Sequence, residues 1–207
     1  TAVVSFSSFM NSGRLDAEYF MPKYDDIENF LANFETTTIP AEFEIFKNSG
    51  TNYTVGEIGV IKTKQVTKRG VNIDGVESYF DSAACVENHS TFLKKNDVIF
   101  ASMGVGSLGK SSLFFYDGDK KFVTDSTLKI YRAKSNSKIL PAVLNLFLQS
   151  KIAQEIIYRH VVGSTGIINI YDSDIAKIPV PILPMATQTE IAALVEKSFN
   201  LRAESER

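Results

Sequence analysis

The chain has 207 residues, of which 44% are hydrophobic and 22% charged, and its formal net charge is −2. These values predict one globular domain, or one domain with an appended element. The small net charge excludes a surface that is basic throughout, so nucleic acid would have to bind a local patch. The single cysteine, Cys85, excludes an internal disulfide. Because no apolar run approaches the ~18 residues of a membrane span, we expect a cytoplasmic protein with no membrane partner.

The N-terminal region, at residues 11–50, carries more acidic than basic side chains. The apolar spacing after Pro22 predicts a helix at about 22–34, with Tyr24, Ile27, Phe30 and Leu31 on one face. From about 54 to 132 the pattern changes to short apolar runs, which predict strands. Within 112–123, Asp117-Gly118-Asp119 predicts a hairpin between two of these strands.

Helical spacing returns at 139–149, where Pro141 fits the first turn of an amphipathic helix, and 151–160 continues or restarts it. Residues 161–170 predict a Gly/Ser/Thr loop that runs into a short strand. Residues 171–184 predict one helical turn and then an extended segment. The prolines of that segment exclude a central strand.

The C-terminal segment predicts one further helix. Thr187 and Glu190 have the spacing of a capping box, in which Thr187 would be the N-cap. An apolar stripe follows, and we expect it to meet a partner helix. The stripe consists of Ile191, Leu194, Val195 and Phe199. The predicted fold is α+β, with a mixed sheet and packed helices in a domain at 1–186 and the start of a long helix at 187–207.

One stretch matches the motif of an enzyme class. Residues 104–111 read GVGSLGKS, which fits the P-loop pattern of nucleotide-binding enzymes, and its glycines also fit the dinucleotide pattern. Both motifs require a helix directly after the loop, where free N–H groups hold phosphate. The following residues instead predict a strand, and no acidic residue is placed for Mg²⁺ or ribose. We therefore favour a glycine turn between strands and keep a P-loop NTPase as the alternative.

Cys85 and His89 are close enough in sequence to suggest a nucleophilic pair or half of a zinc site. A structural zinc site needs a second pair, and His160 stands alone. A nucleophilic pair needs an orienting third group. A core thiol and a surface histidine are the favoured interpretation, and we expect neither a metal nor a cofactor.

Local charge points to a different function. Residues 62–70, KTKQVTKRG, carry four basic side chains and no acid. A strand at 58–64 would place Lys62 and Lys64 on one face, followed by a basic loop at 66–72. Lysine and arginine neutralise phosphates, and arginine and glutamine can read base edges. The alternative is a solvated edge strand protected by lysines. The GSTG segment at 163–166 could donate to phosphates or could simply end a helix.

Three segments in their order resemble the target-recognition domain of the specificity subunits of type I restriction-modification systems. They are residues 14–31, RLDAEYFMPKYDDIENFL; residues 93–114, LKKNDVIFASMGVGSLGKSSLF; and residues 144–197, from LNLFLQS to ALVEK. The third segment is the most specific, because it resembles the helix, the G-S-T loop and the proline-rich exit of the family. Gln188 stands where the family has a glutamine at the start of its spacer helix.

The resemblance implies a role without catalysis. Specificity subunits carry two such domains, and each reads half of a split DNA site. They bind adenine-N6 methyltransferase subunits and, in the restriction complex, a translocase and nuclease subunit. This chain has one domain and the start of one spacer helix. We therefore expect half of a subunit, a half-subunit that self-associates, or a domain of a fused methylase-nuclease, with the acidic region at 11–50 off the DNA face.

Double-stranded DNA is thus the predicted partner, and a helical module that does not bind DNA is a further alternative. The residues predicted to contact DNA are Lys62, Lys64, Gln65, Lys68, Arg69, Lys110, Ser111, Ser164 and Thr165.

Overall fold

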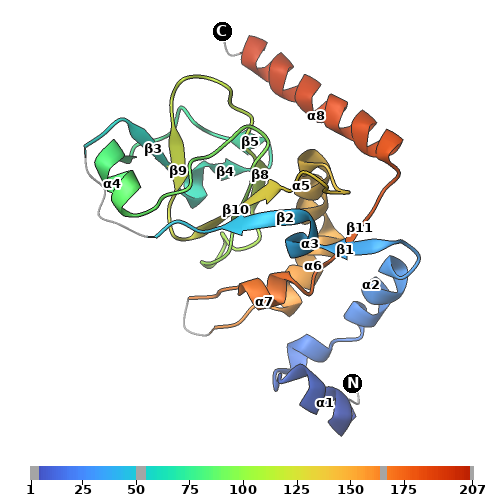
Figure 1. Cartoon of the computed structure of the whole chain (residues 1–207). Coiled ribbons are helices and arrows are strands. Elements are labelled where there is room, and N and C mark those ends of the chain that lie inside the picture. Colours follow the sequence, from blue (N-terminus) through green and yellow to red (C-terminus); the bar gives the residue numbers. More distant parts are fainter. Residues whose placement is uncertain (1–4, 50–54, 164–166, 206–207) are drawn as a thin grey trace.

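The computed structural model describes residues 5–49, 55–163 and 167–205. Helices cover a body of small sheets, with α1 and α2 at one end and α8 along the outside at the other (Figure 1). The helices are α1 (Phe6–Ser12), α2 (Lys23–Leu31), α3 (Ile39–Glu42), α4 (Ser82–Glu87), α5 (Pro141–Gln149), α6 (Lys151–Arg159), α7 (Asp172–Ile175) and α8 (Met185–Ser205), with the 3-10 turns η1 (Ala17–Phe20) and η2 (Thr63–Gln65). No helix of this described part is both long and apolar enough to cross a membrane.

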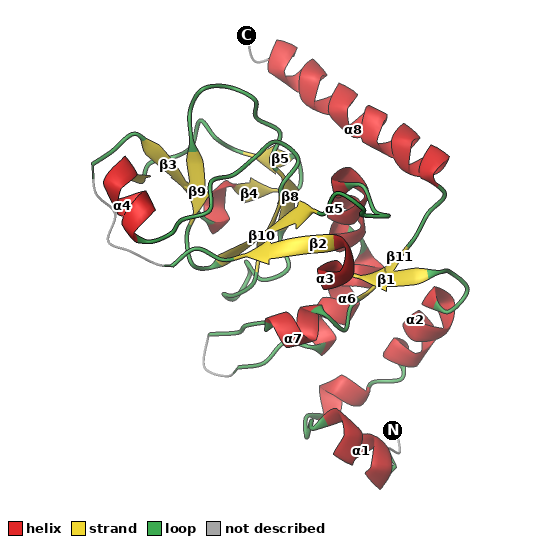
Figure 2. Ribbon diagram, in the orientation of Figure 1, coloured by secondary structure: helices red, strands yellow, loops and turns green. Residues whose placement is uncertain are grey.

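In the described part of the chain the strands form four sheets, and Figure 2 shows the strands in yellow. They are β1 (Thr36–Thr38), β2 (Phe43–Phe46), β3 (Ile58–Ile61), β4 (Val66–Thr67), β5 (Gly70–Val71), β6 (Tyr79–Phe80), β7 (Val98–Ala101), β8 (Ser111–Leu113), β9 (Phe122–Thr124), β10 (Leu128–Ala133) and β11 (Pro179–Pro181). The largest sheet is antiparallel, in the order β2-β10-β7-β8. A second sheet has the order β6-β3-β9, in which β3 and β9 are parallel.

Strand β7 shows how the layers are built. Its four residues are all buried, because both faces of the strand are covered. Val98 and Phe100 pack with Leu144 of α5 in one apolar cluster, whereas Ile99 and Ala101 belong to a second cluster with residues of the β6-β3-β9 sheet. Side chains of a strand alternate between its faces, so β7 lies between the helical layer and the second sheet. The predicted α+β class with a mixed sheet is confirmed.

The predicted hairpin around Asp117-Gly118-Asp119 is wrong. Strand β8 pairs with β7, and β9 pairs in parallel with β3, so the two strands lie in different sheets. The turn residues are present, but the segment 114–121 crosses from one sheet to the other. A local turn signal indicates that the chain changes direction and does not identify the hydrogen-bonding partner of each strand.

The helical segment after Leu140 is broken at Ser150. Helix α5 ends at Gln149, and the Ser150 hydroxyl accepts a hydrogen bond from the Ala153 amide at 3.2 Å. Ser150 is therefore the N-cap of α6, and the chain restarts a helix at Lys151 rather than continuing one. This restart sets the direction of the α6 face that carries Gln154 and Tyr158.

Helix α8 begins at Met185, two residues before the predicted N-cap, so Thr187 is an internal residue and does not cap the helix. Ile191, Val195 and Phe199 pack against the main apolar cluster, whereas Leu194 is 68% exposed. Most side chains of the predicted stripe therefore pack against the body of the same chain. A partner helix would have to meet a different face of α8.

Gln188 fixes the start of α8 to the body. Its side chain is fully buried, and its Oε1 accepts from the Leu140 amide at 2.9 Å. Its Nε2 donates to the carbonyls of Lys138 and Leu183, each at 2.8 Å. One glutamine therefore ties together α8, the segment before it and the loop that leads into α5. An amide is required here because the site needs one acceptor and two donors.

Candidate nucleic-acid interface

The glycine-rich stretch forms the loop between β7 and β8, and no helix follows it. Most of its backbone N–H groups already donate hydrogen bonds within the protein. The donors are the N–H groups of Gly104, Ser107, Leu108, Gly109 and Lys110, and each bonds a backbone carbonyl. A P-loop needs such groups free to hold phosphate at the start of a helix. The P-loop alternative for 104–111 is therefore wrong, and the predicted turn between two strands is correct.

The glycine loop is held by helix α6. Gln154 donates from its Nε2 to the Gly109 carbonyl at 2.8 Å and to the Leu148 carbonyl at 2.6 Å. Gly109 has φ +86°, and a Cβ at this position would lie 2.7 Å from Gln154 Oε1. Only glycine fits both the backbone conformation and the space. Lys110 follows directly, with its side chain exposed at the end of the loop.

The basic segment is a short hairpin rather than the continuation of a strand. Strand β3 ends at Ile61, η2 follows, and β4 and β5 form a ladder of two residue pairs. The prediction that Lys62 and Lys64 share one face of a strand is therefore wrong. The Thr67 hydroxyl accepts from the Arg69 amide and donates to the Gly70 carbonyl, which closes the turn. Lys64, Lys68 and Arg69 are exposed, and Lys62 is partly buried.

Gln65 and Ser111 are buried, contrary to their predicted role as DNA contacts. Gln65 is 2% exposed, its Oε1 accepts from the Lys62 amide, and its Nε2 donates to the Gly75 carbonyl at 2.6 Å. Ser111 is 1% exposed and its hydroxyl donates to the Asn145 carbonyl. Neither side chain presents a free group to a base or a phosphate. In this structure both side chains instead hold neighbouring segments of the fold together through these hydrogen bonds.

Three of the predicted lysines converge on one groove of about 480 Å³. Lys64 and Lys68 come from the hairpin region, and Lys110 comes from the glycine loop. Gln149 and Tyr158, which the sequence analysis did not select, line the same groove. No carboxylate lines it among the described residues. We call this groove, with its three lysines, the lysine groove.

The lysine side chains differ in their partners. Lys64 forms an ion pair with Glu77 at the margin of the groove, and both side chains are exposed. Its ammonium group lowers the pKa of the Glu77 carboxyl below its ordinary value. An exposed pair of this kind contributes little, so Lys64 can exchange Glu77 for a phosphate at small cost. Lys68 and Lys110 form no ion pair with any residue that the structure describes.

Arg69 points to a different surface. It lines a separate hollow of about 710 Å³, together with Asp74, Asp117 and residues of α8. The two carboxylates make that hollow less favourable for a polyanion than the lysine groove.

The loop that contains Ser164 and Thr165 lies outside the described residues, but the segments that flank it are beside the glycine loop. The Gly104 amide donates to the Ile168 carbonyl at 2.9 Å, and Met103 and Val162 each form an isolated β-bridge with Asn169. The chain segments that lead into and out of the 163–166 loop therefore lie next to the glycine loop at 104–111.

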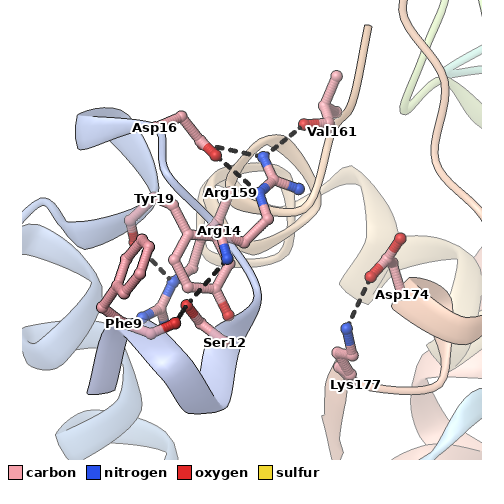
Figure 3. Close-up of polar contacts among 9 residues, drawn as sticks. All are labelled: Phe9, Ser12, Arg14, Asp16, Tyr19, Arg159, Val161, Asp174 and Lys177. Carbon is pink, nitrogen blue, oxygen red and sulfur yellow. Dashed lines mark hydrogen bonds and ion pairs between the residues drawn. The ribbon is translucent and has the colours of Figure 1, made fainter. Parts of the chain in front are cut away.

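The N-terminal segment contacts α6 and the residues after it through paired charges (Figure 3). Arg14 donates to both carboxylate oxygens of Asp16, at 2.8 and 2.9 Å, and to the Val161 carbonyl at 3.0 Å. Arg159 donates to the Tyr19 carbonyl at 3.1 Å, and its guanidinium lies over the Tyr19 ring. A hollow of about 1050 Å³ lies here, lined by Asp16, Glu18 and Glu155 beside Arg14, Lys23, Lys151 and Arg159. Arg14, Lys23 and Arg159 are already paired with carboxylates. It therefore offers less to an anion than the lysine groove.

Cys85 is buried and His89 is exposed, as the sequence analysis favoured. Burial raises the pKa of the Cys85 thiol, which disfavours the reactive thiolate. No group of three potential metal ligands occurs within the described part of the chain.

His160 gives the fold a pH dependence. The ring is 6% exposed and lies 5.6 Å from the Tyr19 ring, and burial lowers its pKa from 6.5 to about 4. The unfolded chain takes up a proton first, so the contribution of neutral His160 is complete above pH 6.5 and is lost as the pH falls to 4. We expect His160→Gln to remove up to about 3 kcal/mol of that acid destabilisation.

The measurement is the free energy of unfolding at pH 7 and pH 4.5, by chemical denaturation, for the wild type and the variant. His89→Asn is the matched control, because asparagine tolerates the positive φ of 49° at this position and the side chain is exposed. An equal pH dependence in the wild type and His160→Gln would contradict the prediction.

A mixed-sheet domain that gathers lysines around one groove and ends in a long helix has the features of a nucleic-acid-binding module. The model of one family, described as the type I restriction modification DNA specificity domain, matches residues 31–207. The chain belongs to this family, and the resemblance found in the sequence is confirmed.

Solved structures have the same fold. The S subunit of a type I restriction-modification system from M. genitalium is 20% identical, with a TM-score of 0.51 over 84% of this chain and 40% of that subunit. The HsdS subunit from Thermoanaerobacter tengcongensis is 10% identical, with a TM-score of 0.52 over 88% and 45% of the two chains. The type IIG restriction endonuclease BpuSI is 7% identical, with a TM-score of 0.51 over 93% and 30%. This chain thus spans less than half of each of these proteins. No curated protein matches it.

Proposed function

We propose that this chain is a target-recognition domain that reads one half of a split DNA site for a restriction-modification complex. The observation that carries the proposal is the convergence of Lys64, Lys68 and Lys110 on one groove whose lining has no described carboxylate. Each ammonium group can neutralise one phosphate and release its counterions. The family to which the chain belongs supports DNA as the polyanion.

The contacts divide into two kinds. The three groove lysines supply sequence-independent affinity to the phosphate backbone. Gln149 and Tyr158 line the same groove, and each would have to exchange a bond to a backbone carbonyl for one to a base. Lys62 and Arg69 lie outside the lining of the groove and are proposed as secondary phosphate contacts. Ser164 and Thr165 belong to the proposed contact set through the adjacent loop.

The proposed partners follow from the same role. The domain, at residues 1–186 as the sequence predicts, directs adenine-N6 methyltransferase subunits and a translocase and nuclease subunit to the site, in the cytoplasm, and does not itself catalyse a reaction. Helix α8 begins the spacer that joins it to a second recognition domain or to another copy of the chain. Leu194 and Leu201 are exposed on α8 and are available to such a helix.

A binding selection tests the proposal. The full-length protein in its methyltransferase complex is incubated with a library of duplexes that carry a randomised segment, and the bound duplexes are sequenced. We expect one short motif to be enriched, with an affinity at least about a thousandfold above that for random duplex. Replacing residues 1–184 with the same region of a relative should change one half of the motif only. Retention of the library without enrichment of any sequence would refute sequence recognition.

A further inference from the structure

The basic hairpin β4–β5 is supported by the C-terminal helix. Gly70 of the hairpin has φ +124°, and a Cβ at this position would lie 2.5 Å from Cε1 of Phe199 in α8. The Phe199 ring therefore lies directly against the hairpin backbone, and only glycine leaves room for it. One turn further along α8, the Arg202 guanidinium donates to the Arg69 carbonyl.

Phe199 also contacts the main body of the domain. Its ring stacks on Phe115, just after β8, with ring centroids 4.8 Å apart and an angle of 16° between the planes. The Lys95 ammonium lies 4.7 Å from the centroid of the Phe115 ring. Phe199 thus bridges the hairpin and the end of β8, the strand that leaves the glycine loop.

Val66, which is 3% exposed, and Val71 pack in the second apolar cluster and hold the base of the hairpin. Its ladder has two residue pairs, and an isolated ladder of this size is marginal in water. On its groove side, Gln149 donates to the Lys68 carbonyl at 3.4 Å and to the Ser111 carbonyl at 3.0 Å. The hollow of about 710 Å³ lies beside the turn of the hairpin, and Phe199 and Arg202 of α8 are among its lining residues. The turn that carries Lys68 is thus contacted by Phe199 at Gly70 and by Gln149 at the Lys68 carbonyl.

We propose that Phe199, assisted by Arg202, is a positioning residue that holds the β4–β5 hairpin so that Lys68 faces the lysine groove. This inference rests on the proposed function and adds a regulatory consequence to it. Because α8 begins the proposed spacer, a shift of α8 would move Lys68, and DNA binding would in turn favour one position of α8 by thermodynamic linkage.

Phe199→Ala tests this coupling without removing a charge. Two quantities are measured on the full-length protein in its methyltransferase complex: the salt dependence of duplex binding, and hydrogen exchange of the amides in 66–72. We expect exchange there to become at least about tenfold faster. We expect the slope of log K against log salt to fall by about one and the affinity near 0.1 M salt to fall about tenfold, as if one lysine were lost.

Matched variants separate positioning from general packing. Ile191→Ala truncates another apolar residue with which α8 packs on the body. It is expected to lower stability and to leave the salt slope and the exchange of 66–72 unchanged. Phe199→Tyr keeps the ring face and should restore the wild-type slope.

The outcomes distinguish the two proposals. If the wild type binds duplex with the expected salt dependence and Phe199→Ala has the same slope or the same hairpin exchange, the positioning role is refuted and the proposed function stands. If the wild type itself shows no salt-dependent duplex binding, the proposed function fails and this inference fails with it. A slope that falls equally in Ile191→Ala would show that Phe199 acts only through helix docking, which also refutes the proposal.

Discussion

Replacing Lys64, Lys68 and Lys110 together with glutamine is expected to weaken duplex binding by about a hundredfold to a thousandfold near 0.1 M salt. The three ammonium groups line one groove, and each phosphate contact contributes about 0.9 to the slope of log K against log salt. The slope should therefore fall by about three. Glutamine keeps side chains of similar length, so the change removes charge with little loss of packing.

The measurement is a titration of labelled duplex at several salt concentrations, with the complete complex. A control variant carries glutamine at Lys120, Lys138 and Lys197, three exposed lysines outside the groove. It loses the same net charge, so it separates local contact from long-range attraction. A slope that falls equally in both variants would mean that DNA binds elsewhere.

The second large effect is expected at the ion pair that joins β7 to β10. Arg132 on β10 donates to both carboxylate oxygens of Asp97, at 2.9 and 2.6 Å, and Asp97 is 2% exposed. The Arg132→Met variant would leave this buried carboxylate without its cation. We expect a loss of about 3 to 5 kcal/mol in the free energy of unfolding. For a chain of this length, the midpoint of thermal unfolding should fall by about 10 °C.

Two further variants test the cause. The double variant Arg132→Met with Asp97→Asn removes the uncompensated charge and should recover most of the lost stability. Lys138→Met breaks the exposed pair with Glu35, whose atoms are 3.4 Å apart, and should cost less than about 1 kcal/mol. Equal losses in Arg132→Met and Lys138→Met, measured by chemical denaturation, would contradict the assignment. Because the pair fixes the start of β7, which leads into the glycine loop, Arg132→Met should also lower DNA affinity at temperatures near its unfolding midpoint.

Coupling of the recognition surface to α8 would give the spacer a second role. In the proposed complex, α8 sets the distance between two recognition domains. The Phe199 contact with Gly70 would also let the same helix influence the position of a phosphate-binding lysine. DNA binding by one domain would then change the DNA affinity of the second domain through the helices that join them.

Several features of this protein were readable from its sequence because they depend on neighbours in the chain. The helices after Pro22 and Leu140 form near their predicted positions, since apolar spacing and proline placement act locally. The glycine stretch at 104–109 turns the chain between two strands, because left-handed backbone conformations require glycine. The ordered motifs identified the family, which the match over residues 31–207 confirms.

Only the tertiary structure decided which residues form the candidate site. Gln65 is adjacent to exposed lysines in sequence, yet the fold buries it against the Gly75 carbonyl. Glu77 reaches Lys64 although the basic segment itself contains no acid. Lys110 and Tyr158 meet the hairpin from distant parts of the chain. The pattern of a strand or helix gives the direction of each side chain relative to its own element, whereas burial and groove formation depend on which elements pair across the fold.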